Sequence, residues 1–168
     1  MKAALDVHYR QDRATAACAV FRHWEDAAPV ELLSAVGTNV AGYRPGRFFE
    51  RELPCLLSIL HAADRKFDSI IIDGYVHLHD SVGKGLGVHL AEALGYQAEV
   101  VGVAKSPLKV ATRFTPIIRG RSSKPLFVSA IGCPLDKAKE SIRNMHGPYR
   151  VPTLLKIVDQ HARNPNRP

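Results

Sequence analysis

Three consecutive isoleucines at positions 70–72 constrain the fold of this chain more than any other feature. A short apolar run without periodicity is typical of a strand buried on both faces, and such strands belong to sheets that helices cover on both sides. The run ends at Asp73, and Gly74 lets the backbone turn sharply beside the carboxylate. Two interpretations stay open: Asp73 serves a ligand at the exposed end of the strand, or it caps the following turn.

Length and composition favour one domain with a polyanionic partner. The chain has 168 residues, 46% of them hydrophobic, which suits a single core. We predict one domain over residues 1–163 and a disordered tail at 164–168. The formal net charge of +7 favours nucleic acid as a partner, although surface charge also serves solubility. No apolar run approaches the ~20 residues that span a bilayer, which predicts a cytoplasmic protein with no membrane partner.

Hydrophobic periodicity and turn signals predict an α/β order of elements. Strands are expected at residues 3–9, 15–23, 30–36, 69–73, 98–104 and 125–129. One helix is expected to begin near Glu52, with Pro54 in its first turn. Three further helices are expected over residues 88–94, 135–145 and 153–162. This order is typical of a ribonuclease H-like, mixed five-stranded sheet in which three antiparallel strands precede parallel ones, with flanking helices.

In that architecture, acids from the first strand, the following helix and the fourth strand converge on a divalent metal. The matching elements here carry Asp6, Glu52 and Asp73. A magnesium site held by carboxylates can activate water and stabilise the leaving oxygen of a phosphodiester. Lys105, at the end of a neighbouring strand, can add positive charge at the phosphate. The plainer interpretations remain open, because Glu is common in a first helical turn and a strand-end Lys is usually solvated.

Motifs along most of the chain, from Ala4 to about Asp159, resemble endonuclease V, a family of metal-dependent nucleases that act near deaminated purines. The motifs that carry this resemblance, in chain order, are Asp6, Tyr43-Arg44-Pro45-Gly46, Arg51-Glu52 with Pro54, Leu56 and Leu57, Asp73-Gly74 followed by His79, Gly85-x-Gly87-x-His89-Leu90, Gly102-Val103-Ala104-Lys105-Ser106, and Pro148-Tyr149-Arg150-x-Pro152.

The resemblance implies an endonuclease that uses Mg²⁺, or Mn²⁺ in its place, to cleave DNA or RNA near deoxyinosine or inosine, leaving a 3′-hydroxyl and a 5′-phosphate. We also expect a monomer without an organic cofactor. By the same resemblance, the metal ligands are Asp6, Glu52 and Asp73, Lys105 joins them in catalysis, the wedge into the nucleic-acid strand is Tyr43 with Pro45 and Gly46, and the base pocket is lined by Phe48, Gly74, His79, Gly85 and Leu108. Ordinary core roles for Phe48 and Leu108, and a core-covering role for Tyr43, stay open.

Three departures from the family pattern are present. The chain lacks the extension that usually precedes the first strand, and residues 107–124 are shorter than the family's hairpin. Gly132-Cys133 stands where the family has Gly-His, which removes a histidine expected close to the metal. We therefore expect weak, metal-dependent cleavage that a Cys133→His change would raise. The alternatives are a nucleic-acid-binding protein with weak or lost catalysis and, third, a related nuclease for another damaged or structured nucleic acid.

The wedge assignment predicts that Tyr43→Ala reduces the preference for inosine more than the general affinity for nucleic acid. An aromatic wedge holds a strand from which a base has been extruded, whereas phosphate contacts do not depend on sequence. Cleavage and binding of matched inosine and unmodified substrates measure the effect. Equal losses on both substrates, or a fall in thermal stability that explains the whole loss, would contradict the assignment.

Overall fold

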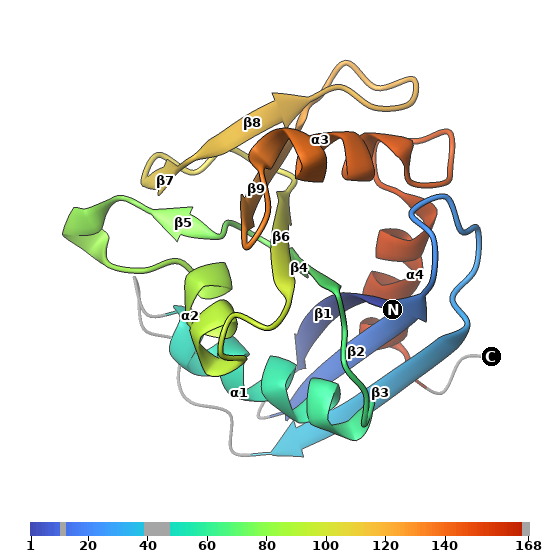
Figure 1. Cartoon of the computed structure of the whole chain (residues 1–168). Helices are drawn as coiled ribbons and strands as arrows, with labels where there is room; N and C mark the ends of the chain where they lie inside the picture. Colours follow the sequence, from blue (N-terminus) through green and yellow to red (C-terminus); the bar gives the residue numbers. More distant parts are fainter. Residues whose placement is uncertain (11–12, 39–47, 166–168) are drawn as a thin grey trace.

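The computed structural model describes residues 1–10, 13–38 and 48–165, in which a seven-stranded sheet has the strand order β3-β2-β1-β4-β6-β9-β8 (Figure 1). The strands of this sheet are β1 (Lys2–Arg10), β2 (Arg13–Phe21), β3 (Glu31–Thr38), β4 (Ser69–Asp73), β6 (Glu99–Ala104), β8 (Phe114–Ile117) and β9 (Leu126–Ile131). A two-stranded ladder pairs β5 (His77–Leu78) with β7 (Ala111–Thr112). The helices are α1 (Phe48–Ala62), a 3₁₀ turn η1 (Asp80–Val82), α2 (Leu86–Ala93), α3 (Leu135–Asn144) and α4 (Thr153–Arg163).

The predicted ribonuclease H-like fold class is confirmed. Strand β2 runs antiparallel to both β1 and β3, whereas β1, β4 and β6 run parallel, as expected for the five-stranded core. The sheet continues beyond this core, because β9 pairs antiparallel with β6 and β8 pairs antiparallel with β9. The sequence pattern missed β8, a four-residue strand that contains Pro116. Proline is tolerated there because β8 is an edge strand, where one row of backbone groups has no ladder partner.

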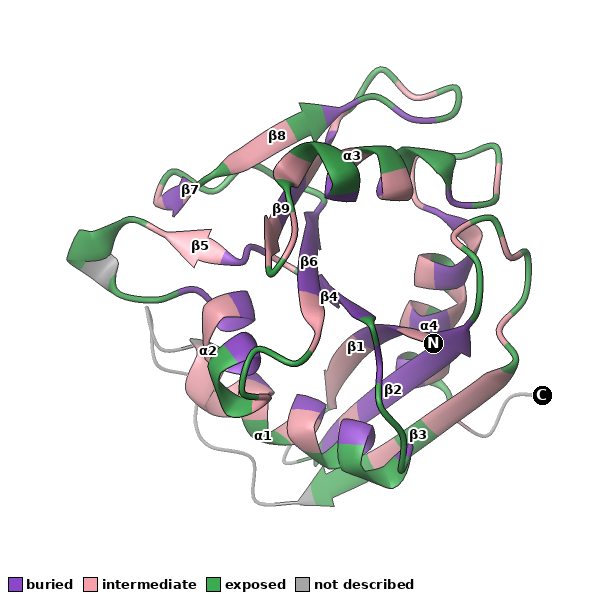
Figure 2. Cartoon of the chain, in the orientation of Figure 1, coloured by how far each residue is buried: buried purple, intermediate pink, exposed green. Residues whose placement is uncertain are grey.

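Alternating side chains of the central strands supply two separate cores. One face carries Ala3 and Leu5 of β1 and packs against α1 and α2. The other face carries Ala4 and packs against α3 and α4. In Figure 1 the two helix pairs lie on opposite sides of the sheet, and in Figure 2 the central strands β2 and β4 are mainly buried while edge strand β3 is not. None of the helices in the described part of the chain is long and apolar enough to cross a membrane.

Helix α1 begins earlier than the sequence predicted. It starts at Phe48, which places Pro54 inside the helix instead of in its first turn. A proline in this position removes one backbone hydrogen bond. The proline is tolerated because Pro54 lies on the exposed side of the helix. Glu52 consequently lies in the second turn, on the side that faces the protein interior.

The turn that follows Asp73 is held by a close backbone approach at Gly102. A Cβ atom at Gly102 would lie 2.5 Å from the carbonyl oxygen of Gly74 and 2.7 Å from Oγ of Ser129. That hydroxyl accepts a hydrogen bond of 3.0 Å from the backbone N–H of Val76. Residues 74–76 therefore fold back over β6, which keeps the Asp73 carboxylate at the edge of the sheet that the carboxyl ends of the parallel strands form.

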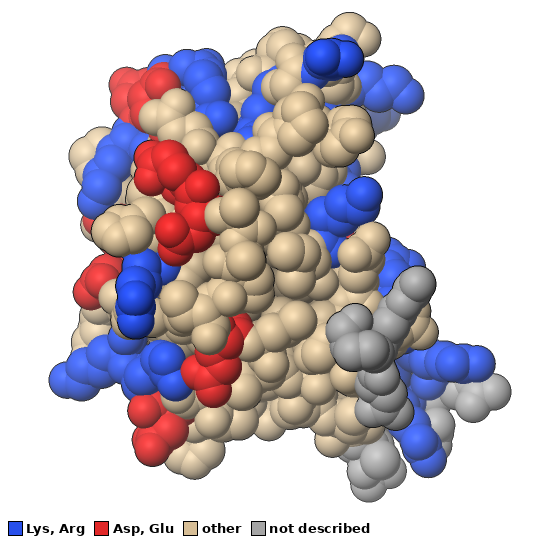
Figure 3. All heavy atoms as spheres, turned by 90° about the vertical axis from the view of Figure 1, so that its right-hand side faces the viewer, with Lys and Arg blue, Asp and Glu red and all other residues tan. Residues whose placement is uncertain are grey.

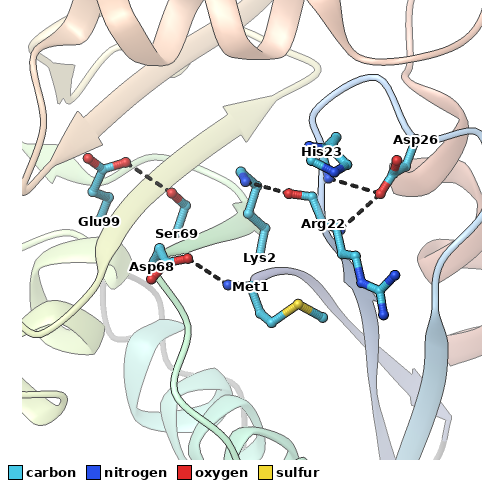
Figure 4. A network of polar contacts seen from close by, with 8 residues as sticks. All are labelled: Met1, Lys2, Arg22, His23, Asp26, Asp68, Ser69 and Glu99. Atoms are coloured by element: carbon cyan, nitrogen blue, oxygen red, sulfur yellow. Dashed lines mark hydrogen bonds and ion pairs between the residues drawn. The ribbon is translucent and has the colours of Figure 1, made fainter.

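The opposite edge, where β1, β4 and β6 begin, is tied by polar contacts (Figure 4). The N-terminal ammonium of Met1 pairs with Asp68 at 2.6 Å, and Ser69 Oγ donates to Glu99 at 2.9 Å. These contacts join the starts of the three strands. Because the strands are parallel and in register, their carboxyl ends lie together at the other edge, which carries the candidate site.

Candidate active site

Three predicted site residues lie on the same face of three adjacent parallel strands. Asp6 is opposite Ala17 and Asp73 is opposite Val103, and both of these neighbours belong to the core beneath α3 and α4. The register that pairs Leu5 with Ile72 places Asp6 beside Asp73 one residue later. Lys105 follows β6 in the same alternation. The strand order β1-β4-β6 thus brings two carboxylates and an ammonium to one edge of the sheet.

Glu52 approaches the same place from α1. Its side chain lies on the inner side of the helix, and the residue is only 8% exposed. Among the described residues, its carboxylate has no hydrogen-bond partner, which is costly for a buried charge. The charged groups that act on its pKa are Asp6 and Asp73, which raise it, and Arg51, which lowers it. Glu52 is therefore a buried acid that faces two further acids.

Helix α4 contributes a fourth carboxylate that the sequence analysis did not assign. Asp159 accepts hydrogen bonds from Arg163 Nε at 3.1 Å and from Arg163 Nη2 at 2.9 Å, and both side chains reach the same cleft. The signal was available, because Asp159 directly follows Val158 in the buried stripe of α4. It could not be interpreted without knowing that α4 packs over the face that carries Asp6.

The cleft formed by these residues has a volume of ≈ 320 Å³. Its lining consists of Leu5, Asp6, Val7, His8, Tyr9, Glu52, Leu56, Ile72, Asp73, Lys105, Asp159 and Arg163. An apolar floor with charged groups around it is a typical arrangement for a site that binds a charged ligand.

An ion pair between Lys105 and Asp73 crosses the cleft edge. The Nζ of Lys105 lies 2.7 Å from Oδ2 of Asp73, and both side chains are a little over 40% exposed. Partial burial lowers the pKa of Lys105, but the hydrogen bond to Asp73 and the charges of Asp73, Asp159 and Asp6 together raise it above its ordinary value. Lys105 therefore carries its positive charge at neutral pH.

The carboxylates of the cleft disfavour one another's ionisation. Burial raises the pKa of Asp6 to about 6, and the charges of Asp73 and Asp159 act in the same direction. Burial also raises the pKa of Glu52 to about 8, again with Asp6 and Asp73 contributing. The hydrogen bonds from Arg163 lower the pKa of Asp159. Strongly raised carboxyl pKa values in a cleft are typical of functional sites.

The endonuclease V family model matches residues 1–117, well over half of the chain. The chain belongs to the endonuclease V family. A curated endonuclease V from Rhodospirillum centenum is 39% identical over 87 residues, a match that covers 49% of this chain and 35% of that protein. The matched segment therefore spans about a third of that relative.

Solved structures of endonuclease V share the fold. The structure of the Streptomyces avermitilis protein has a TM-score of 0.76 at 27% identity and covers 97% of this chain and 79% of its own. The human protein has a TM-score of 0.75 at 22% identity, with 96% and 82% covered. The Ciona intestinalis protein, in complex with a 24mer DNA containing an inosine, has a TM-score of 0.83 at 18% identity, with 98% and 84% covered.

The sequence resemblance put Cys133 where a histidine was expected beside the metal site, and the structure corrects that expectation. Strand β9 runs antiparallel to β6 and pairs Ile131 with Val100, so Cys133 lies beyond the start of β6. Asp73 pairs with Val103 at the other end. Burial and the charge of Glu99, which lies outside the cleft, raise the pKa of the Cys133 thiol. The expected gain from Cys133→His thus loses its basis, because Cys133 lies at the opposite end of the strands from Asp73. The sequence motif does not reveal this, since it does not show that β9 runs antiparallel to β6.

The other expected endonuclease V site residues have different outcomes. The wedge residues Tyr43, Pro45 and Gly46 lie outside the described residues, as does the side chain of Phe48. Gly74, His79 and Gly85 lie in the segment between β4 and α2, which contains β5. Leu108 lies just before β7, the strand that pairs with β5. Their role in a base pocket stays a prediction.

Two of these residues have local features that bear on the prediction. Leu108 is 44% exposed, so the alternative that it is an ordinary core residue is wrong. A Cβ atom at Gly85 would lie 2.3 Å from the carbonyl oxygen of Val76, so glycine is needed there for backbone packing alone.

Whether the cleft fits a divalent cation can be judged from its donor set. In the conformation described, no three Asp, Glu, His or Cys side chains of the described residues are placed to hold a metal ion together. The chemistry of the donors nevertheless fits, because hard cations prefer several carboxylate oxygens and four carboxylates line one cleft. A cation there would also relieve the repulsion that raises the pKa values of Asp6 and Glu52. The side chains must therefore rotate to coordinate one.

The raised pKa values predict that the protein without divalent ions loses stability as the pH rises. The folded state holds protons on Asp6 and Glu52 more tightly than the unfolded chain, whose values are 3.8 and 4.5. The associated stability is present below those values and is lost as pH rises through about 6 and about 8. In EDTA, we expect Tm to fall from about pH 5 to about pH 9, and Glu52→Gln to raise Tm by a few degrees at the alkaline end.

The matched control is Glu25→Gln, because Glu25 is an exposed acid outside the cleft. This control should keep the parental slope of Tm against pH. A Glu52→Gln protein whose slope equals that of the parent would show that Glu52 does not titrate in the folded cleft as described.

Proposed function

We propose that this protein is a metal-dependent endonuclease that cleaves nucleic acid near inosine or deoxyinosine, leaving a 3′-hydroxyl and a 5′-phosphate. The observation that carries the proposal is the convergence of Asp6, Glu52, Asp73 and Asp159 with Lys105 in one cleft of an endonuclease V family chain. Four acids and a lysine in one half-buried cleft are unfavourable for stability, which supports a functional reason for their presence.

Asp6, Glu52 and Asp73 are the residues that would hold Mg²⁺ or Mn²⁺, with Asp159 as a further carboxylate of the same cleft. A bound divalent ion would supply an activated water and stabilise the negative charge that develops on the leaving oxygen. This assignment agrees with the buried position of Glu52, whose carboxylate has charged neighbours but no hydrogen-bond donor among the described residues.

The chain's own cations have separate tasks in this proposal. Lys105 Nζ donates to Asp73 in the structure and could donate instead to a non-bridging oxygen of a scissile phosphate bound at the same edge. Arg163 keeps Asp159 ionised and oriented through two hydrogen bonds. The apolar residues Leu5, Leu56 and Ile72 line the buried side of the cleft and lower the polarity around the carboxylates, which strengthens these interactions.

Inosine is proposed as the base because the family and the sequence motifs agree. The Ciona intestinalis relative is described in complex with inosine-containing DNA. In this chain, Tyr43, Pro45 and Gly46 would act as the wedge, and Phe48, Gly74, His79, Gly85 and Leu108 would line the pocket for the extruded base. We further propose that residues 1–163 act as a single-domain, cytoplasmic monomer without an organic cofactor.

The binding-only alternative has lost its original motive. It rested on the missing histidine at Cys133, a position that the structure places at the far edge of the sheet from Asp73. The four-carboxylate cleft does not depend on that residue. We therefore retain the nuclease as the one function that a specific observation supports.

Replacing Asp6 or Asp73 with Asn is expected to reduce cleavage at least about 10²-fold while leaving nucleic-acid binding largely intact. Asparagine keeps the shape of the side chain but removes the charge that attracts a divalent ion. The measurement compares cleavage of labelled inosine-containing and unmodified DNA and RNA, with Mg²⁺ or with EDTA. Asp136→Asn is the matched control, because Asp136 is an exposed acid outside the cleft. Parental rates in either cleft variant at saturating Mg²⁺ would disprove the assignment.

A further inference from the structure

We propose that the loop between β8 and β9, residues 118–125, is a phosphate-binding arm that holds the nucleic-acid backbone beside the cleft, on the Lys105 side. The inference rests on the proposed nuclease function and extends it to a surface outside the cleft. The loop lies beyond residues 1–117, which the family model matches.

The loop presents two cations that nothing in the described structure neutralises. Arg121 and Lys124 are exposed, and neither has an acidic partner among the described residues. Ser123 between them is also exposed and can donate through its hydroxyl. Arg, Lys and Ser side chains are the groups that most often contact phosphate oxygens in protein–nucleic acid complexes.

The backbone of the loop is fixed from below by Arg119. This residue is only 5% exposed, and its guanidinium donates to the carbonyl oxygens of Met145, of Ile142 at 3.1 Å and of Tyr149 at 2.6 Å. One arginine of the loop thus serves as an internal anchor that bonds the connection between α3 and α4. Five donors in a rigid fork suit this task.

The next residues continue the attachment. Gly120 has φ of +62°, and a Cβ atom there would lie 2.3 Å from the carbonyl oxygen of Pro148. The N–H of Arg121 donates to the same carbonyl at 3.3 Å. Near the end of the loop, the N–H of Lys124 donates to Ser122 Oγ at 3.1 Å, which forms a local turn. The loop therefore loses little backbone conformational entropy when a ligand binds, because its backbone is already held.

Arg150 connects the arm directly to the candidate active site. Its Nη2 donates to the carbonyl of Pro125, at the end of the loop, at 2.6 Å and also to the carbonyl of Lys105. Strand pairing agrees with this link, because Phe127 lies opposite Ala104. Lys105 in turn contacts Asp73 in the cleft. A phosphate bound by the arm and a phosphate at Lys105 would thus lie along the same edge of the sheet.

The charge distribution distinguishes this edge from the opposite one. Where the parallel strands begin, acids accompany the basic groups: Met1 pairs with Asp68, and Lys137 pairs with Glu99, although Arg22 and Lys66 there have no ion-pair partner among the described residues (Figure 4 shows the first pair). Figure 3 shows one face of the molecule, on which the left half carries Asp and Glu interspersed with Lys and Arg, whereas the charged residues along the right-hand edge are mainly Lys and Arg, so the acids of this face are separated from that edge. Such separation favours a polyanion that covers one side of the molecule.

The test uses the full chain in EDTA, so that binding is measured without cleavage. Binding of a labelled DNA duplex with one deoxyinosine is followed by fluorescence anisotropy over about 50 to 300 mM salt. The variant Arg121→Gln with Lys124→Gln removes both cations of the arm. We expect the slope of log K against log salt to become less negative by about 1.8, because each lost phosphate contact in duplex DNA accounts for about 0.9.

The matched control is Arg22→Gln with Lys66→Gln. Arg22 and Lys66 are exposed, have no ion-pair partner among the described residues and lie near the strand starts. The two substitutions therefore remove the same amount of charge as the arm variant, but from the opposite edge. The control should keep the parental slope, and both variants should keep the parental Tm. Lys124→Gln alone should change the slope by about half as much as the double variant does.

Two results would overturn the inference: an unchanged slope in the arm variant, or an equal change in the arm and control variants, which would indicate general charge only. In Mg²⁺, the arm variant should raise KM and leave kcat near the parental value, whereas a fall in kcat alone would also contradict the role. The failure of the proposed function is distinguishable, because it would appear as a parental protein that binds the duplex with the expected salt slope but cleaves none of the substrates.

Discussion

Repulsion among carboxylates in a half-buried cleft is the constraint on which the rest of this structure depends. The parallel alignment of β1 and β4 places Asp6 beside Asp73, and α1 and α4 add Glu52 and Asp159. Isolated like charges at such a place would separate or neutralise. The protein compensates in part, with Lys105 on Asp73 and Arg163 on Asp159. The remaining repulsion appears in the raised pKa values of Asp6 and Glu52.

The fold holds these groups together through features that lie away from the charges. Both faces of the central strands are buried in separate cores, so the strands that carry the acids cannot move apart without exposing apolar surface. The close approach at Gly102 fixes the turn after Asp73, and the contacts around Met1 and Asp68 fix the starts of the strands. Stability at the two cores and the far edge therefore supports an unfavourable arrangement at the site, as is common for catalytic clefts.

Local signals were sufficient to predict the elements that carry the site but not all of their relations. The isoleucines at positions 70–72 and the acid after them correctly predicted β4 and the position of Asp73 at its exposed end, because a buried strand has a strong local pattern. Asp159 was missed because its importance depends on α4 packing over the face of Asp6, a long-range contact. Cys133 was misplaced for the same reason, since only the pairing of β9 with β6 shows which edge it occupies.

Boundaries failed for more local reasons. Pro54 suggested a helix start near Glu52, yet an exposed proline can be accommodated inside a helix, and α1 begins at Phe48. The metal-binding roles proposed for the acids rest on the chemistry of carboxylates, whereas the rotation that would bring three of them onto one ion is not encoded in any motif. A divalent ion must therefore offset the free-energy cost of that rotation by removing the repulsion among the carboxylates.

The measurement that tests this requirement most directly is Mn²⁺ binding to the protein without nucleic acid, followed by electron paramagnetic resonance. The account predicts saturable binding to the parental protein, at least about tenfold weaker binding to Asp73→Asn, and parental binding to the exposed-acid variant Asp136→Asn. Binding that is absent from the parental protein, or that is equal in the parental and Asp73→Asn proteins, would contradict the account.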